Sequence, residues 1–240
     1  MTYIYVDGNN AYHNLKRCCK ELNRPPLYEK DLDWKRMFTD LIEEDQDSIQ
    51  EVVWYRVEKV DGLSTHMDEI KKHFIENEPS FTESQRSSLM DQLDNLPQPI
   101  IQKVTNEWTR AVEWLNHQRR IHHKMLREVE KFTRSFGFRF ITLGYMKVDP
   151  KRRKTLMEKG LDIAIAINVL KDLQNDDCDR QIIVSNDGDF SVLLNYIRKI
   201  EPSIKLEVVN IGVNFNRKLE SAADQLYHIT PRQLETYILT

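Results

Sequence analysis

Residues 182–190 constrain the fold of this chain more than any other stretch. The apolar residues 182–184 favour a buried β-strand, and the polar turn that follows them contains Asp187 and Asp189. From Phe190 onward, apolar residues recur at helical spacing. A strand, an acidic turn and a helix form the unit of an open α/β sheet, whose ligands bind at the carboxyl ends of the strands. We therefore expect Asp187 and Asp189 to face a functional site.

The start of the chain repeats this pattern. Residues 3–6 read as a short strand that ends in Asp7, and a helix is expected to follow, with Asn9 or Asn10 capping its free N–H groups. Strand and helix patterns alternate through most of the remaining chain. The predicted fold class is therefore α/β, with a mostly parallel central sheet covered by helices on both faces.

Residues 61–110 differ from this alternation. They read as long polar helices punctuated by Pro79, Pro97 and Pro99, without a convincing strand. We predict a single domain over residues 1–240, with residues 61–110 as a helical insertion within it. After the insertion, the patterns predict a long helix over 114–136, a strand over 138–143, a basic loop over 145–159 and a buried helix that begins near Gly160.

Charge and composition narrow the class of protein. A net charge of -3 over 240 residues excludes a strongly basic nucleic-acid coat, although a local patch can still bind phosphates. The three cysteines lack metal-ligand spacing and suit reduced thiols. No apolar run approaches the ~20 residues of a membrane span, and the N-terminus does not resemble a signal peptide. We expect a cytoplasmic protein that makes no membrane contact.

The acids at the ends of the expected strands suggest a metal site. Asp7 and the pair Asp187 and Asp189 can converge at one edge of a parallel sheet, and Asp162 can join them from the start of a helix. Carboxylates in one cleft repel each other unless a cation compensates. Hard oxygen ligands without cysteine or organised histidine fit Mg²⁺ or Mn²⁺ rather than Zn²⁺. Such a site suits phosphodiester hydrolysis.

Three motifs in this chain resemble, in the same order, the signature motifs of NYN-domain proteins in the PIN-like nuclease superfamily. They are Asp7-Gly8-Asn9-Asn10, Lys159-Gly160-Leu161-Asp162 and Ser185-Asn186-Asp187-Gly188-Asp189-Phe190. The resemblance covers about residues 1–60 and 112–230. It implies a Rossmann-like α/β/α sandwich and a divalent-metal-dependent ribonuclease. The leading hypothesis for this chain is an endoribonuclease that acts on single-stranded or structured RNA.

The same resemblance assigns roles to individual residues. It implies that Asp7, Asp162, Asp187 and Asp189 are catalytic, metal-binding acids, and that Asn10 and Ser185 order this cluster at the substrate side. NYN proteins often carry a further aspartate where this chain has Asn168, so this chain departs from the family pattern there and has no carboxylate at that position. The helical insertion is not part of the usual pattern and is a candidate surface for substrate or a protein partner.

Simpler roles remain open for several of these residues. Asp187 and Asp189 could stabilise a helix N-terminus, Asp162 could be an N-cap, and Ser185 could satisfy local backbone groups. Lys151, Arg152 and Arg153 could guide a nucleic-acid backbone toward the acids or simply form a solvated loop.

Other functions compete with the nuclease. The main alternative is a catalytically weak RNA-binding or protein-interaction adaptor. A Toprim-type site is disfavoured because that fold expects a glutamate where this chain has Asp7. A dinucleotide site is disfavoured because no glycine-rich turn follows any expected strand.

Overall fold

The computed structural model describes residues 1–42, 49–61, 67–148, 156–175, 177–212, 214 and 216–239. Lys151, Arg152 and Arg153 lie outside the described residues. The chain divides into two compact units. The first comprises Met1–Glu58, Met125–Gly144 and Gly160–Thr240, and the second comprises Lys59–Lys124 and Tyr145–Lys159. Residues 61–110 fall within the second unit, and their description as an insertion in a single domain stays a prediction.

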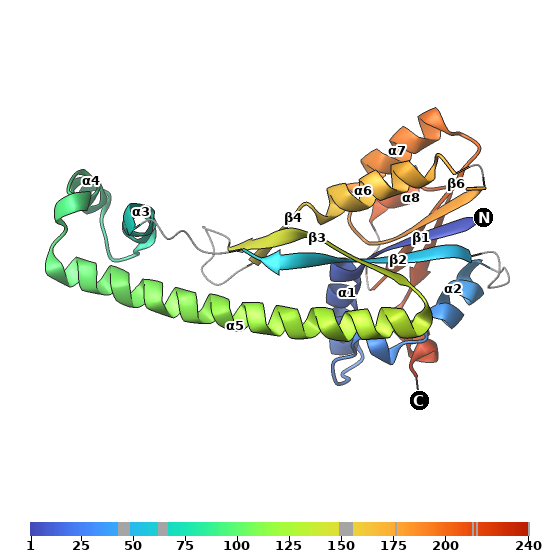
Figure 1. Cartoon of the computed structure of the whole chain (residues 1–240), viewed down its shortest axis with the longest axis horizontal. Coiled ribbons are helices and arrows are strands. Elements are labelled where there is room, and N and C mark those ends of the chain that lie inside the picture. Colours follow the sequence, from blue (N-terminus) through green and yellow to red (C-terminus); the bar gives the residue numbers. More distant parts are fainter. Residues whose placement is uncertain are drawn as a thin grey trace. The chain divides into compact units, whose positions relative to one another are not determined.

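A mostly parallel sheet runs through the first unit (Figure 1). Within the described residues its strand order is β4-β3-β2-β1-β5-β6-β7. The pairs β1–β2, β1–β5, β5–β6 and β6–β7 are parallel, whereas β3 and β4 are antiparallel. The strands are β1 (Thr2–Asp7), β2 (Ile49–Val60), β3 (Arg139–Val148), β4 (Leu156–Lys159), β5 (Arg180–Val184), β6 (Lys205–Ile211) and β7 (Gln225–Ile229).

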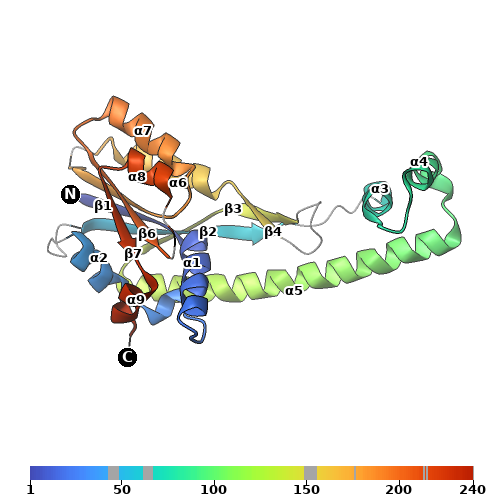
Figure 2. The ribbon, with the colours of Figure 1, turned by 180° about the vertical axis from the view of Figure 1, so that it is seen from behind.

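Helices cover both faces of the sheet in the first unit (Figures 1 and 2). On one face lie α6 (Leu161–Asp172), α7 (Phe190–Ile200) and α8 (Arg217–Ala222). On the other lie α1 (Gly8–Glu21), α2 (Trp34–Ile42), α9 (Pro231–Leu234) and the last turns of α5 (Gln98–Phe136). This arrangement is a PIN-like α/β/α sandwich, as the sequence predicts.

The central strands are buried on both faces because their side chains alternate between two cores. Ile4 of β1 lies beside Ile182 of β5, and both join the apolar cluster that also contains Leu15 of α1. Tyr5 points to the opposite face, where its hydroxyl donates a 3.0 Å hydrogen bond to Asp172 Oδ2 of α6. Some polar side chains are also buried within the strands, among them Arg56 of β2, Gln181 of β5 and Glu207 of β6.

The second unit contains α3 (Met67–Asn77), α4 (Glu83–Asp91), a short 3₁₀ turn (Leu93–Asn95), most of α5, the end of β3 and all of β4. It has a small apolar core of its own, formed by Ile70, Phe74, Ile75, Leu96 and Val104. The start of α4 is fixed by a capping box in which Thr82 and Gln85 exchange hydrogen bonds. No helix in the described part of the chain combines the length and the apolar character needed to cross a membrane.

Two element boundaries differ from the sequence prediction. The helix expected from residue 114 begins at Gln98, because Pro99 occupies the first turn, where its missing N–H group costs no hydrogen bond. The expected basic loop over 145–159 contains the end of β3 and all of β4 instead. Tyr145 pairs with Lys159 and Val148 with Leu156, so this hairpin satisfies backbone groups that a loop would leave to water.

Candidate acidic site at the carboxyl edge of the sheet

Asp7 closes β1 and caps the helix that follows it. Its Oδ1 accepts a 2.9 Å hydrogen bond from the backbone N–H of Asn10, which satisfies one of the free donors at the start of α1. The Asp7 side chain is buried. Gly8 is required at the next position because a Cβ atom there would meet the side chain of Trp54 and lie 2.6 Å from the carbonyl oxygen of Tyr55. The sequence motif therefore places a carboxylate at a tightly packed strand end.

A hydrogen-bond chain connects this acid with the turn that follows β5. The hydroxyl of Ser185 donates to Asp7 Oδ2 over 3.1 Å and accepts from the backbone N–H of Asp187, also over 3.1 Å. The Oδ1 atom of Asp187 then accepts a 2.9 Å hydrogen bond from the backbone N–H of Asp189. Asp7, Asp187 and Asp189 are therefore held in one connected network across neighbouring strands β1 and β5, which is what the strand-end argument predicts.

Asp189 occupies the N-cap position of α7 but does not act as a cap. Its side chain makes no capping hydrogen bond, and the residue is exposed. The role that the sequence left open for this acid, a favourable negative charge at a helix N-terminus, does not need such a hydrogen bond, and the exposed carboxylate is accessible from solvent.

Asp162 lies in the first turn of α6 and is half-buried. Gly160, in a left-handed conformation with φ of 87°, is the N-cap of this helix, so the N-cap role considered for Asp162 is wrong. Burial raises the pKa of Asp162, and the nearby carboxylates of Asp187 and Asp189 raise it further. These electrostatic effects place Asp162 in the neighbourhood of the β5 turn, so α6 contributes a further acid to the same edge of the sheet.

The side chain of Asn10 connects the segment after β1 with the turn after β5. Its Oδ1 atom accepts hydrogen bonds from Nδ2 of Asn14 (2.6 Å) and from the backbone N–H of Asn186 (3.0 Å). Like Ser185, it therefore holds the two strand ends in register. Asn14 and Asn186 were not predicted from the sequence to be site residues, although Asn14 stands at helical i+4 spacing from Asn10.

A second group of amides lies where β6 ends. Nδ2 of Asn186 and Nδ2 of Asn210 both donate to the carbonyl oxygen of Asn214, over 3.1 and 2.9 Å. A Cβ atom on Gly188 would lie 2.6 Å from Nδ2 of Asn216, so the β5 turn packs closely against this group. These asparagines could not be identified from the sequence, because nothing in their local pattern signals contacts with a turn so far away in the chain.

Asn168 does not extend the acidic group. Its Nδ2 donates a 3.0 Å hydrogen bond to the carbonyl oxygen of Ala164 within its own helix. The amide thus satisfies itself locally, as polar side chains inside helices often do.

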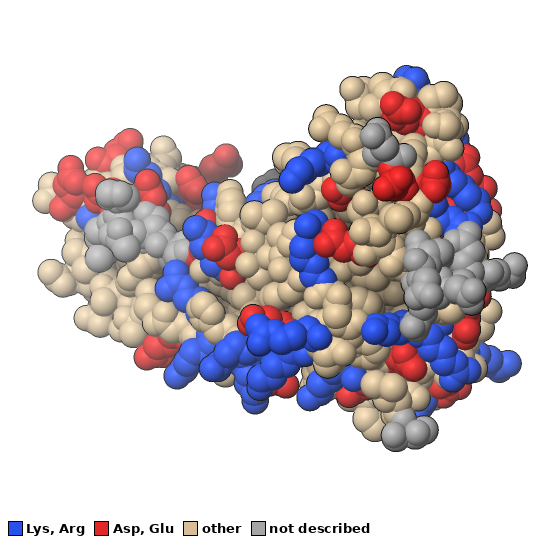
Figure 3. Space-filling model, turned by 45° about the vertical axis from the view of Figure 1, so that its right-hand side comes forward, with Lys and Arg blue, Asp and Glu red and all other residues tan. Residues whose placement is uncertain are grey.

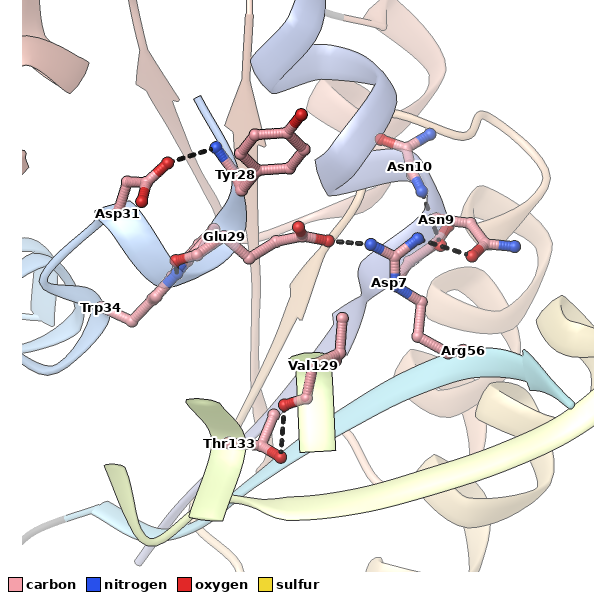
Figure 4. Close-up of polar contacts among 10 residues, drawn as sticks. All are labelled: Asp7, Asn9, Asn10, Tyr28, Glu29, Asp31, Trp34, Arg56, Val129 and Thr133. Carbon is pink, nitrogen blue, oxygen red and sulfur yellow. Dashed lines mark hydrogen bonds and ion pairs between the residues drawn. The ribbon is translucent and has the colours of Figure 1, made fainter. Parts of the chain in front are cut away.

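A buried ion pair contacts the first turn of α1. Arg56, within β2, pairs with Glu29 and donates a 2.9 Å hydrogen bond from Nη1 to Oδ1 of Asn9 (Figure 4). Its guanidinium also lies over the ring of Tyr12, 5.2 Å from the centroid. Burial lowers the pKa of His13, and the positive charge of Arg56 lowers it further. The sequence offered no signal for this pair, since Glu29 and Arg56 belong to unrelated segments.

The carboxylates at this edge of the sheet are the type of ligand that a divalent cation needs. Carboxylate oxygens are the ligands that Mg²⁺ and similar hard ions prefer, and a cation relieves the repulsion that raises the pKa of Asp162. Within the described ranges, however, no three His, Cys, Asp or Glu side chains lie close enough together to hold a metal ion. Binding would therefore require the carboxylates of Asp162, Asp187 and Asp189 to draw closer together.

The α/β/α sandwich and the acids at its carboxyl edge define a PIN-like protein. The NYN domain family matches residues 109–230, about half of the chain, and the protein belongs to that family. The matched segment contains Asp162, Asp187 and Asp189, whereas Asp7 precedes it. The family indicates a nuclease-like protein, and such nucleases generally use divalent metals and act on RNA.

Comparison with individual proteins adds little. No curated protein matches this chain. The chain is similar to a solved structure from Vibrio parahaemolyticus RIMD 2210633, described as a protein of unknown function, with 18% sequence identity and a TM-score of 0.48. The match covers 99% of this chain and 95% of the other. No argument about function follows from a likeness at this level.

Proposed function

We propose that this chain is a ribonuclease that uses Mg²⁺ or Mn²⁺ to hydrolyse internal phosphodiester bonds of RNA. The observation that carries the proposal is the hydrogen-bond chain from Asp7 through Ser185 to Asp187 and Asp189. It joins acids from two neighbouring strands at the edge of the sheet where α/β proteins bind their ligands. Metal-dependent hydrolysis is the chemistry that such a group of acids serves best.

The side chains would divide the work according to their surroundings. A divalent cation held by Asp162, Asp187 and Asp189 together with Asp7 would polarise a phosphoryl oxygen and lower the pKa of a water molecule. Asp7, buried and bonded through both oxygens, fixes the position of the β5 turn. The raised pKa of Asp162 favours its protonated form when no cation is bound. Ser185 and Asn10 would orient the acids beside the substrate.

The substrate would be held through its phosphates. Figure 3 shows Lys and Arg side chains gathered along the lower edge of one face, where positive charge can contact a nucleic-acid backbone despite the net negative charge. Lys151, Arg152 and Arg153 remain candidates for the same role.

We also propose a cytoplasmic location and a protein partner. The cysteines Cys18, Cys19 and Cys178 are all buried as free thiols, which suits a reducing cytoplasm. The helices between residues 61 and 110 offer a surface for a protein partner.

The test is a cleavage assay on RNA labelled internally and at either end. Cleavage should require Mg²⁺ or Mn²⁺, stop with EDTA and yield internal fragments rather than single nucleotides. Asp7→Asn and Asp187→Asn should each lower the rate at least a hundredfold, while Asp91→Asn, an exposed acid of α4, should leave it unchanged. Metal-dependent cleavage that survives both site substitutions would overturn the proposal.

A specific observation supports one alternative function. The described residues contain no ready group of three metal ligands, and Asn168 replaces an acid that the family often carries. A catalytically weak adaptor that binds RNA or protein would fit these facts. It would bind RNA with the same affinity in EDTA and in Mn²⁺, and Asp187→Asn would not change that affinity.

A further inference from the structure

Two neighbouring helices of the first unit expose an unusual amount of apolar surface. Within the described part of the chain, α6 and α7 carry five of the large exposed hydrophobic side chains. Their exposed fractions are 67% for Ile163, 60% for Ile167, 73% for Val192, 52% for Tyr196 and 46% for Ile200. We call these five residues the α6–α7 face.

On α6 the apolar residues lie on both sides of the helix. Leu161, Ile165 and Val169 are buried against the sheet. Ile163 and Ile167 are four residues apart on the opposite side, where a surface helix normally carries polar residues. β-Branched residues do not favour a helix at exposed positions either, so helix propensity gives no reason for their presence. A helix that is apolar on both sides is normally covered on both sides.

α7 repeats this arrangement. Phe190, Leu194 and Ile197 are buried, whereas Val192, Tyr196 and Ile200 follow one another at i+4 spacing on the exposed side. The two helices lie next to each other on the same face of the sheet, as Figures 1 and 2 both show. Their exposed sides therefore form one surface and not two isolated stripes.

The size of this surface suits a protein interface. The five side chains together expose roughly 600 Å², which equals the largest apolar patches found on monomeric proteins, and those are often functional. A standard protein–protein interface takes about 800 Å² from each partner. With a rim of polar atoms, the α6–α7 face reaches that range.

The charges at the ends of the two helices indicate what covers the face. Asp162 begins α6 and Asp189 precedes α7, whereas the exposed Lys171 and Lys199 lie in the last turns of these helices. None of the four side chains forms an ion pair with another described residue. When two copies pack with their helices antiparallel, the acidic end of each faces the basic end of the other.

We propose that the α6–α7 face binds a second copy of this chain in a two-fold symmetric dimer. An apolar centre with acids at one end and lysines at the other is self-complementary under a two-fold axis, and it needs no other partner. The interface would lie beside Asp162 and Asp189, so the two acidic sites of the dimer would border the same contact. The proposal does not depend on nuclease activity.

The test is sedimentation of the full chain from about 1 to 200 µM. The unaltered protein should dimerise, and Ile167→Glu and Tyr196→Glu should each weaken the dimer at least tenfold, because each places a charge in an apolar contact. Ile121→Glu and Tyr28→Glu are matched controls, since these side chains are each 49% exposed outside the face. They should leave the dimer unchanged. Circular dichroism checks that every variant is folded.

A second pair of substitutions tests the orientation. Lys171→Glu combined with Lys199→Glu should also weaken the dimer, because each lysine would then face an acid of the partner. A wild-type monomer at 200 µM would overturn the proposal and leave the face to a different protein. The assignment to this face would be overturned if the dimer resisted Ile167→Glu and Tyr196→Glu. It would also be overturned if the two control substitutions weakened the dimer as much as these do. A dimer indifferent to the lysine changes would overturn the antiparallel arrangement.

Discussion

The hydroxyl of Ser185 donates a 3.1 Å hydrogen bond to Oδ2 of Asp7, although 178 positions separate the two residues in the sequence. Both residues are buried. Because β1 and β5 are adjacent and parallel, their carboxyl ends meet, and Ser185 is the first residue after the paired segment of β5. The same hydroxyl also accepts from the N–H of Asp187, so a single oxygen sets the distance between the first acid and the β5 turn.

Replacing Ser185 with alanine should therefore loosen the acidic edge. The change removes a hydrogen bond to a carboxylate and leaves the N–H of Asp187 without its acceptor, which costs about 1.5–3 kcal/mol. We expect a loss of cleavage rate between about tenfold and a hundredfold, the same free energy expressed as a rate factor. The rate is measured on RNA at saturating Mn²⁺.

The matched control is Ser203→Ala, an exposed serine in the turn after α7. It should retain full activity and stability. If Ser185→Ala loses stability but cleaves RNA at the normal rate, then Ser185 supports only the fold and has no part in ordering the acids.

Gly8 should tolerate no larger residue. Gly8→Ala would drive a methyl group into the Trp54 side chain and to within 2.6 Å of the Tyr55 carbonyl oxygen, so the backbone of β1 or β2 must shift. Forced overpacking of this kind typically costs about 1–3 kcal/mol. Urea unfolding should show the loss as a lower midpoint at an unchanged slope.

Gly188→Ala provides the comparison within the same site. There the new methyl group would meet the end of the Asn216 side chain, again at a shortest distance of 2.6 Å. This side chain can move without a backbone shift, although moving it weakens the hydrogen bond that its Oδ1 accepts from the N–H of Lys218. The stability loss should be clearly smaller than for Gly8→Ala. Equal losses would mean that Asn216 is as immobile as the β2 backbone.

The strand ends could be predicted from the sequence because local pattern determines them. A run of apolar β-formers that stops at Asp7 or at Ser185 marks the edge of a sheet, and the parallel topology then brings the two edges together. The positions of Asp187 and Asp189 within that edge followed from the same reasoning. The capping role left open for Asp162 was wrong because Gly160 occupies the N-cap position.

Long-range polar pairing could not be predicted in this way. Glu29 and Arg56 meet only because a 3₁₀ turn and β2 are folded against the same helix, and neither residue has a local signal for the other. The extension of β3 into residues 145–148 was missed for a related reason. A two-stranded edge is stabilised by its partner strand more than by its own apolar pattern.

Asp162→Asn should make the protein more stable at neutral pH while lowering its activity. Since burial and the carboxylates of Asp187 and Asp189 raise the pKa of Asp162, the ionised form destabilises the folded state at pH 7. Once the pH falls below the ordinary pKa of aspartate, both states carry the proton and this cost is gone. The stability advantage of the amide should therefore be present at pH 7 and shrink toward pH 4, as measured by thermal unfolding.

A divalent cation should reduce or reverse the stability advantage of Asp162→Asn over the unaltered protein. Mn²⁺ should raise the melting temperature of the unaltered protein more than that of Asp162→Asn, because the cation compensates the same repulsion. Asp91→Asn serves as control. It should not be more stable than the unaltered protein at pH 7, and Mn²⁺ should raise its melting temperature as much as that of the unaltered protein. An amide variant less stable than the parent at pH 7 would contradict the repulsion that the structure indicates.

The buried pair of Arg56 and Glu29 should be strongly coupled in a double-mutant cycle. Both side chains are almost completely excluded from solvent. Removing one partner strands a buried charge, so Arg56→Met and Glu29→Met should each cost about 3–5 kcal/mol, whereas the double variant should lose far less than their sum. The free energies come from urea unfolding at pH 7.

The exposed pair of Arg24 and Glu235 is the natural comparison, since its side chains meet at 2.9 Å but remain more than a third accessible. Its coupling should be at most about 1 kcal/mol, because water screens both charges. The buried pair also holds Asn9 at the start of α1, so Arg56→Met should slow RNA cleavage even at temperatures where the variant is fully folded. Equal coupling in the two pairs would mean that water reaches Arg56. Full activity of folded Arg56→Met would mean that Asp7 keeps its position without the support of this pair.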